Sequence, residues 1–226
     1  MKFLLTNDDG IDAPGLAALV RALAPLGQCV VVAPERHLSG CSHQVTVDRP
    51  LALTERLALR YALDGTPVDC TRVGLAHLAA DADWVIAGIN AGGNLGADVY
   101  MSGTVAAVRE AALLGRPGIA ISHLVKRPAA IDWDRAARWA EHVVRQLLVE
   151  SRKLGKYWNV NLPHAEIDMP PIAVCQLDRN PMPIRFAVED GRLRYCATYQ
   201  ERVRHAGFDV DHCFDGRITV TELSLH

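Results

Sequence analysis

Two acidic residues stand side by side at the end of a short apolar run near the start of the chain. They are Asp8 and Asp9 in the stretch KFLLTNDDG, and Gly10 follows them. Adjacent carboxylates repel each other unless a cation or hydrogen-bond donors compensate both charges, and a divalent metal ion is the simplest cation. Because consecutive side chains of a strand point to opposite faces, both acids can reach one ion only if the backbone turns, which glycine permits.

Three further loops carry groups that a metal and phosphate site uses. Ser39 in PERHLSGCSH and Asn90 in GINAGGN offer neutral oxygens, which together with carboxylates suit Mg²⁺, Mn²⁺ or Ca²⁺. The turn Ser102-Gly103-Thr104 is expected to present free backbone N–H groups at the start of a helix, where an anion such as phosphate is favoured. A metal ion beside an anion site is typical of phosphoryl transfer.

Each of these features also has an ordinary structural interpretation. Asn-Asp-Asp-Gly is a common turn composition, Ser39 could belong to a plain loop, and Ser102 or Thr104 could serve only as an N-cap. GINAGGN lacks the spacing and the lysine of a phosphate-binding P-loop. The prediction of a catalytic site therefore depends on all four loops lying at the same place in the fold.

Alternating strand-like and helix-like segments predict that the loops do meet. An apolar strand at residues 2–6, a helix from Pro14 that ends by Gly27 and an apolar strand at 29–34 form a βαβ unit. The alternation continues with segments at 83–90, 104–115, 118–122, from about Asp132, and at 158–163. This pattern predicts an α/β protein with an open, doubly wound, mostly parallel sheet, in which ligands bind beyond the carboxyl ends of the strands.

The sequence pattern changes from about Pro170. Short strand-like runs, IAVCQL, RLRYCAT and RITVTEL, are separated there by turn-forming residues, which predicts β-rich hairpins appended to the α/β core. We expect a single domain over residues 1–226, with the core at 1–164 and a β-rich extension at 165–226.

Composition restricts the partners. The formal net charge is −2 with no block of Lys and Arg, so we expect no stable nucleic-acid binding. No apolar run approaches the roughly 20 residues that span a bilayer, and the start of the chain lacks a signal-peptide pattern. The six cysteines are scattered without a C-x-x-C pair, which fits reduced thiols. We therefore expect a cytoplasmic protein with no membrane partner.

Six motifs together resemble the SurE survival-protein family of metal-dependent nucleotidases. They are LLTNDDGIDAPGL, VVAPERHLSG, GTPVDC, GINAGGNLGADV, SGTVAA and VNLP, in the family's order and spacing over roughly residues 1–164. The resemblance implies a Rossmann-like phosphomonoesterase that hydrolyses nucleoside 5′-monophosphates, and also 3′-nucleotides and short polyphosphate. It further implies one divalent cation, Mg²⁺ or Mn²⁺ with Ca²⁺ as a substitute in crystals, and a homodimer or homotetramer.

The resemblance also assigns roles to single residues. The family's metal ligands fall on Asp8, Asp9, Ser39 and Asn90. The positions that line the phosphate fall on Asn94, Ser102, Gly103 and Thr104. As a catalytic residue, Asp8 or Asp9 would orient the attacking water as general base, and the residues alone leave that choice open.

Three departures from the family pattern stand out. Met101 occupies the place of the usual Tyr before Ser-Gly-Thr, His37 and His43 flank the second loop, and the region after Pro163 is short. Two other functions compete with hydrolysis. One is a metal- and nucleotide-binding module without turnover; the other is a nucleotide-sugar glycosyltransferase, which would usually carry Asp-x-Asp at a later strand end.

Overall fold

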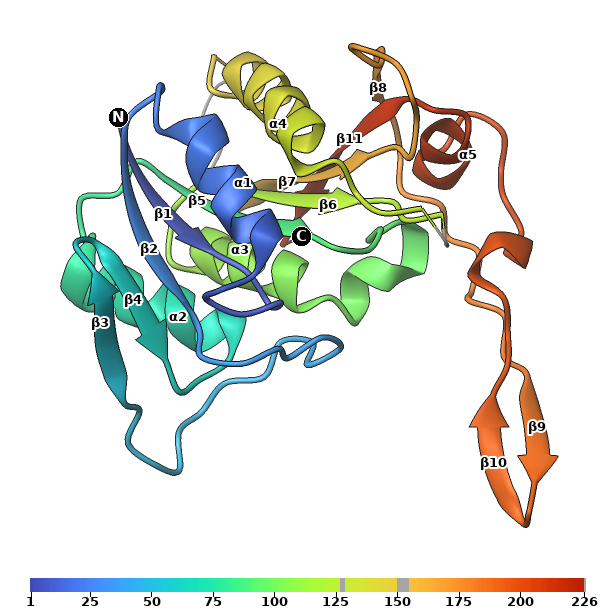
Figure 1. Cartoon of the computed structure of the whole chain (residues 1–226), viewed down its shortest axis with the longest axis horizontal. Coiled ribbons are helices and arrows are strands. Elements are labelled where there is room, and N and C mark those ends of the chain that lie inside the picture. Colours follow the sequence, from blue (N-terminus) through green and yellow to red (C-terminus); the bar gives the residue numbers. More distant parts are fainter. Residues whose placement is uncertain (127–128, 150–154, 226) are drawn as a thin grey trace.

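The computed structural model describes residues 1–126, 129–149 and 155–225, and these residues contain a nine-stranded sheet with the order β3-β4-β2-β1-β5-β6-β7-β11-β8 (Figure 1). Its strands are β1 (Lys2–Thr6), β2 (Gln28–Pro34), β3 (Leu53–Leu57), β4 (Arg60–Leu63), β5 (Trp84–Asn90), β6 (Gly118–His123), β7 (Lys156–Leu162), β8 (Ile172–Val174) and β11 (Ile218–Ser224).

Six neighbouring strands, from β4 through β2, β1, β5 and β6 to β7, pair in parallel. The chain moves outward from β1 through β2 on one side and through β5, β6 and β7 on the other. The order of the strands therefore reverses at β1 and β5, which is the switch point where open α/β sheets bind ligands. The doubly wound sheet predicted from the sequence is confirmed.

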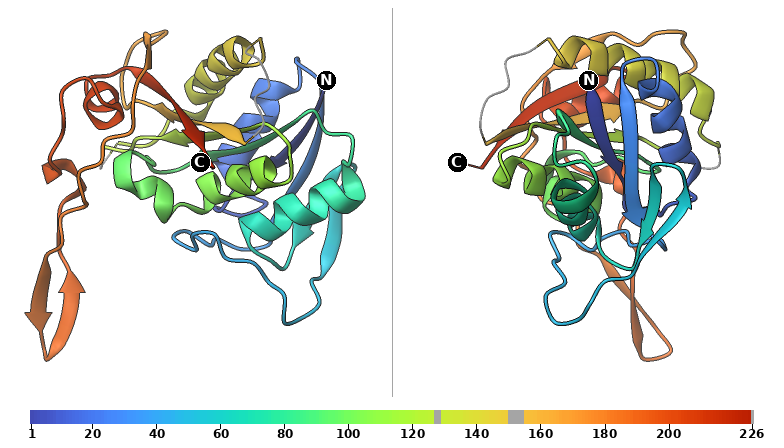
Figure 2. Two further views of the ribbon diagram at one scale, coloured as in Figure 1. Left: turned by 180° about the vertical axis from the view of Figure 1, so that it is seen from behind. Right: turned by 90° about the vertical axis from the view of Figure 1, so that its left-hand side faces the viewer.

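Helices cover both faces of this sheet. They are α1 (Pro14–Leu23), α2 (Pro67–Val73), α3 (Gly103–Leu113), α4 (Trp133–Leu147) and α5 (Asp209–Phe214), with short helical turns η1 (Gly74–Leu78), η2 (Gly96–Tyr100) and η3 (Tyr199–Glu201). The helices α1 and α4 pack together on one face, and α2 and α3 lie on the other (Figures 1 and 2). None of the described helices is long and apolar enough to cross a membrane.

Local sequence explains why these elements form. Pro14 begins α1 at its first turn, where proline's missing N–H costs nothing. Asp132 caps α4 by accepting a hydrogen bond from the Arg135 backbone N–H at 3.0 Å, and its apolar stripe, which includes Trp139, is buried. The strand β5 is buried on both faces, as a continuous apolar run predicts.

The predicted β-rich C-terminal region is present, and the structure shows how it is divided. The strand β11 pairs antiparallel to β7, and β8 pairs parallel to β11, so both extend the main sheet. The strands β9 (Phe186–Glu189) and β10 (Arg192–Tyr195) form a separate antiparallel hairpin that projects from the body of the molecule (Figure 1). The structure also places β3, β4 and α2 in the stretch 35–82, for which the sequence pattern predicted no element.

Candidate metal and phosphate site

The paired acids lie directly after β1, at the carboxyl edge of the sheet beside the switch point. Asn7 closes the turn that carries them: its Nδ2 donates to the Gly10 carbonyl at 2.9 Å, and its Oδ1 accepts from the Gly10 N–H at 3.2 Å. Gly10 has a φ of +104°, a conformation that residues with a Cβ rarely adopt. The backbone turn that the sequence required between the two acids and the following helix is thus present.

Asp8 is buried, with 3% of its surface exposed. Its Oδ1 accepts a hydrogen bond from the Thr104 hydroxyl at 2.6 Å. Burial raises the pKa of Asp8 to about 6, the hydrogen bond from Thr104 opposes that rise, and the charge of Asp9 adds to it. A positive charge near Asp8 would therefore lower the free energy of its ionised form.

Asp9 joins the other loops to this place. Its Oδ2 accepts a hydrogen bond from the Ala91 N–H at 3.0 Å, in the loop that follows β5. Its Oδ1 lies 3.2 Å from His37 Nδ1, in the loop that follows β2. The side chain of Asp9 is 13% exposed, so solvent reaches it.

Asn90 is the last residue of β5, and an irregularity in the strand sets its direction. The pairing of β5 with β6 shifts register between Ala87 and Asn90, as bulges beside active sites commonly do to re-aim a side chain. The side-chain Nδ2 of Asn90 donates to the Gly92 carbonyl at 2.8 Å. The amide is thereby fixed within the loop that also contacts Asp9.

Ser39 lies in an exposed stretch of the loop after β2. The neighbouring Leu38 N–H donates to the Asp8 carbonyl at 2.8 Å, which holds this loop beside the acids. The loop is also attached to α3, because His43 Nε2 lies 2.9 Å from the Glu110 carboxylate and Arg109 Nε donates to His43 Nδ1 at 3.2 Å. His43 is therefore half-buried in contacts that hold the loop.

The donor set fits a hard divalent cation. Within the described residues no three His, Cys, Asp or Glu side chains gather in a group that could hold a metal ion. A metal bound by Asp8 and Asp9 would need neutral oxygens to complete its shell, and Ser39 and Asn90 lie in loops held directly against these acids. Carboxylate, hydroxyl and amide oxygens are ligands of Mg²⁺ and Mn²⁺.

The turn at the start of α3 packs against Asp8. A Cβ placed on Gly103 would lie 2.9 Å from the Asp8 Cβ and 2.9 Å from Cys41 Sγ, closer than such atoms approach. Ser102 is the N-cap of α3, since its hydroxyl accepts from the Val105 N–H at 3.1 Å. The hydroxyls of Ser102 and Thr104 are thus engaged within the protein, and the N–H groups of the first helical turn are the donors that an anion can use.

Asn94 is held by polar side chains of β6 and β7, to which the sequence analysis gave no role in the site. Its N–H donates to Asn161 Oδ1 at 2.8 Å, and its carbonyl accepts from Asn159 Nδ2 at 2.8 Å and from Asn161 Nδ2 at 3.1 Å. Its side-chain Nδ2 donates to the Ser122 hydroxyl at 2.7 Å. Two asparagines two residues apart in a buried strand were the available signal, because buried amides need hydrogen-bond partners.

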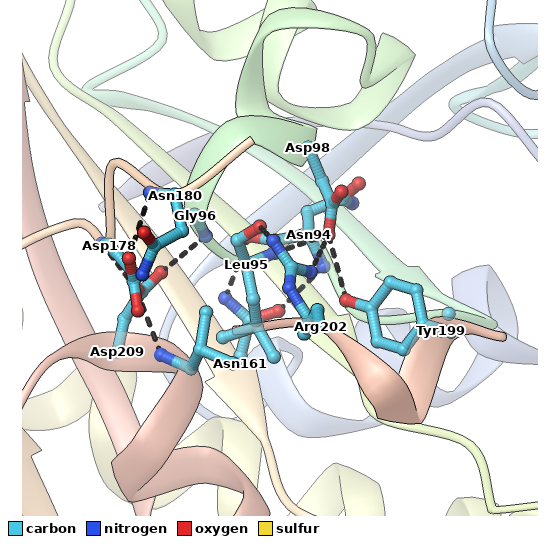
Figure 3. Close-up of polar contacts among 12 residues, drawn as sticks. Asn94, Leu95, Gly96, Asp98, Asn161, Asp178, Asn180, Tyr199, Arg202 and Asp209 are labelled. Atoms are coloured by element: carbon cyan, nitrogen blue, oxygen red, sulfur yellow. Dashed lines mark hydrogen bonds and ion pairs between the residues drawn. The ribbon is translucent and has the colours of Figure 1, made fainter. Parts of the chain in front are cut away.

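A buried ion pair fixes the next part of this loop. Arg202 Nη1 donates to Asp98 Oδ2 at 2.8 Å, and Tyr199 donates its hydroxyl to the same oxygen at 2.7 Å (Figure 3). Arg202 Nη2 also donates to the Leu95 carbonyl at 3.1 Å. Asp209 Oδ2 accepts from the Gly96 N–H at 2.8 Å. Side chains from beyond residue 198 therefore hold the loop that carries Asn94, and no local pattern indicated them.

The structure brings the predicted residues to one edge of the sheet. Thr104 and Gly103 contact Asp8 directly, and Leu38 links the loop of Ser39 to Asp8. Ala91, the residue after Asn90, donates its N–H to Asp9. Asn94 lies in the loop after Asn90, against β6 and β7.

The chain is similar to several known proteins. The sequence profile of the family described as "Survival protein SurE" matches residues 3–182. A protein of Synechocystis sp., named as a candidate 5′-nucleotidase, is 50% identical over 227 residues and all of both chains. The 5′-nucleotidase SurE of Clostridium beijerinckii is 33% identical, over 99% of this chain and 92% of its own. A crystal structure of the SurE protein from Aquifex aeolicus matches with a TM-score of 0.90 and 34% identity, over 100% of this chain and 94% of that one.

Proposed function

Because this chain belongs to the SurE family, we propose that the edge holding Asp8, Asp9, Ser39 and Asn90 is the metal-binding and catalytic centre of its 5′-nucleotidase activity. The protein is a metal-dependent nucleotide phosphatase of that family. One observation carries the assignment of the site: Thr104, in the helix-start turn suited to phosphate, donates directly to the buried Asp8. The predicted metal and phosphate positions are therefore adjacent.

Asp8, Asp9, Ser39 and Asn90 would hold Mg²⁺ or Mn²⁺, which would supply Lewis-acid polarisation of a phosphate oxygen and a lowered pKa of a water ligand. The chain's own residues do the remaining work. The N–H groups of Gly103 and Thr104 bind phosphate oxygens, together with Asn94, and stabilise the charge that develops on them. Asp9 orients the attacking water, because it is the acid that solvent reaches, whereas Asp8 is buried.

The finer assignments follow the family resemblance. The substrates are nucleoside 5′-monophosphates, with 3′-nucleotides and short polyphosphate hydrolysed as well. Residues 1–226 act as one domain in a cytoplasmic homodimer or homotetramer. Exposed apolar side chains on the β9–β10 hairpin, among them Val188 and Leu193, support association between copies, as does the projection of that hairpin from the body.

The decisive experiment measures phosphate release from GMP, AMP and an aryl phosphate with Mn²⁺ or Mg²⁺, with and without a chelator. The variant Asp8→Asn should lose about 100-fold or more in kcat/KM, since even the supporting groups of metal ligands contribute 10- to 100-fold. Asp12→Asn is the matched control, because its carboxylate is 92% exposed. Calorimetric titration with Mn²⁺ adds a readout that does not depend on turnover. Phosphate release that survives chelation or Asp8→Asn would overturn the metal assignment.

A further inference from the structure

A cavity of about 680 Å³ opens beside the proposed catalytic centre. Its inner wall is the segment Ala91–Gly93, and the Ala91 N–H donates to Asp9 at 3.0 Å. The cavity therefore begins one residue after Asn90. Its volume lies within the range of roughly 300–1,000 Å³ that is common for small-molecule sites, and it is larger than a phosphate group needs.

Two further segments complete the lining. Leu124–Lys126, directly after β6, supply an apolar surface with a lysine beside it, and Tyr199 and Gln200 supply the remaining lining residues. Gly92 and Gly93 have no side chains, so their peptide groups border the cavity. An apolar surface combined with a few polar groups is the usual lining of a site for a flat heteroaromatic ligand.

Tyr199 forms a wall that is fixed in place. Its hydroxyl donates to Asp98 at 2.7 Å (Figure 3). The hydroxyl oxygen also lies 3.3 Å from the position that a Cβ on Gly93 would take. Its ring stacks on Phe214 with 6.1 Å between centroids, and the Arg202 guanidinium lies 5.0 Å from its centroid. Both partners restrict movement of the ring, so the wall is formed before any ligand arrives.

The part of the lining formed by Leu124 is also fixed in place. Leu124 is buried, and its N–H donates to the Leu162 carbonyl at 2.8 Å. It packs in a cluster with Leu95 and Val210, which belong to the same loop and helix that Asp98 and Asp209 hold. Lys126 and Gln200, in contrast, are exposed at the cavity, so their side chains are free to reach a ligand.

We infer that this cavity binds the nucleoside part of the substrate while its phosphate lies at Asp8 and Asp9, an assignment that rests on the proposed function. Lys126 and Gln200 are the residues that read the base. Lysine offers only donors, so Lys126 favours a base with an oxygen acceptor on its edge, such as guanine, over one with an amino donor there, such as adenine, whereas glutamine can pair with either. GMP is accordingly expected to be a better substrate than AMP.

The test compares kcat/KM for GMP, AMP and an aryl phosphate in Lys126→Met and Gln200→Ala. Loss of one hydrogen bond at the rim should lower kcat/KM for GMP about two- to tenfold, through KM, while the value for the aryl phosphate stays within twofold. Lys126→Met should also reduce the ratio of GMP to AMP. Both side chains are exposed, so both variants are expected to fold. Gln28→Ala, an exposed glutamine at the amino end of β2, is the matched control.

The outcomes separate this inference from the proposed function. If the unaltered enzyme hydrolyses no phosphate ester with either metal, the proposed function fails. If it hydrolyses all three substrates and the two variants leave the ratio of GMP to aryl phosphate unchanged, the cavity is not the nucleoside site. Equal losses on the aryl phosphate and on GMP would also overturn the inference, because they would place Lys126 or Gln200 in the phosphate centre.

Discussion

The buried ion pair between Arg202 and Asp98 joins the C-terminal segment to the loop of the proposed catalytic centre, and Arg202→Met tests that connection. The Arg202 side chain is 2% exposed and that of Asp98 is 12% exposed, so solvent screens their interaction poorly. Methionine keeps much of the side-chain volume but removes the charge. The Asp98 carboxylate would then retain the hydroxyl of Tyr199 at 2.7 Å and the Leu95 N–H at 3.2 Å as its donors.

Removal of one partner from a buried pair costs roughly 3–5 kcal/mol, because the remaining charge stays buried. The two donors that Asp98 retains place the expected cost near the lower end of that range. Loss of the hydrogen bond from Arg202 to the Leu95 carbonyl adds about 1 kcal/mol. We therefore expect Arg202→Met to lower the free energy of unfolding by about 4 kcal/mol.

Urea denaturation measures this change as a shift in midpoint at constant slope. The exposed Arg185, which lies 3.6 Å from Glu201, is the matched control, and Arg185→Met should change stability by less than about 1 kcal/mol. A cycle with Asp98→Asn should show that the double variant loses clearly less than the sum of the single variants. Additive losses, or a loss for Arg202→Met no larger than that of the control, would refute the reasoning.

Three shorter predictions concern the site and the core. Gly103→Ala should abolish Mn²⁺ binding in calorimetric titration, because its Cβ would lie 2.9 Å from that of Asp8; binding equal to that of the unaltered protein would contradict the packing. Asn161→Ala should raise KM even at temperatures where the variant is fully folded, because Asn94 loses two of its hydrogen bonds. An unchanged KM would argue against this support. Burial lowers the pKa of His123 from 6.5 to about 4. Between these pH values the unfolded chain therefore binds a proton at His123 that the native state does not bind. The free energy of unfolding should therefore fall by up to about 3 kcal/mol as the pH drops from 6.5 to 4. In His123→Asn, urea titrations should show that the free energy of unfolding depends less steeply on pH over this range.

Local sequence was sufficient for the elements of the core. The apolar runs that became β1, β2, β5 and β6 are continuous, and the helical stripe that became α4 repeats every three to four residues, so each could be read without knowledge of its neighbours. The placement of the acids, of Asn90 and of the Ser102 turn at one edge followed as well. Parallel strands connected by helices bring their carboxyl ends to the same side of the sheet.

The roles of individual side chains depend on contacts between residues that lie far apart in the sequence. Ser102 and Thr104 have similar hydroxyls two residues apart, yet one caps α3 and the other donates to Asp8. Only the packing of α3 against the turn after β1 distinguishes them. The strand β11 likewise joins β7 through a pairing that spans more than fifty residues.

The doubly wound core could be predicted from the sequence alone, as could the need of the paired acids in NDDG for compensating charge or donors, because strand alternation, helical periodicity and charge repulsion act over a few residues. In contrast, the folded chain was needed to show that Arg202, 104 residues from Asp98, holds the loop of Asn94, and that Tyr199 lines a cavity beside Asp9. Such contacts depend on how distant segments pack, and the gain from burying a charge pair or an aromatic ring leaves no periodic trace in the chain.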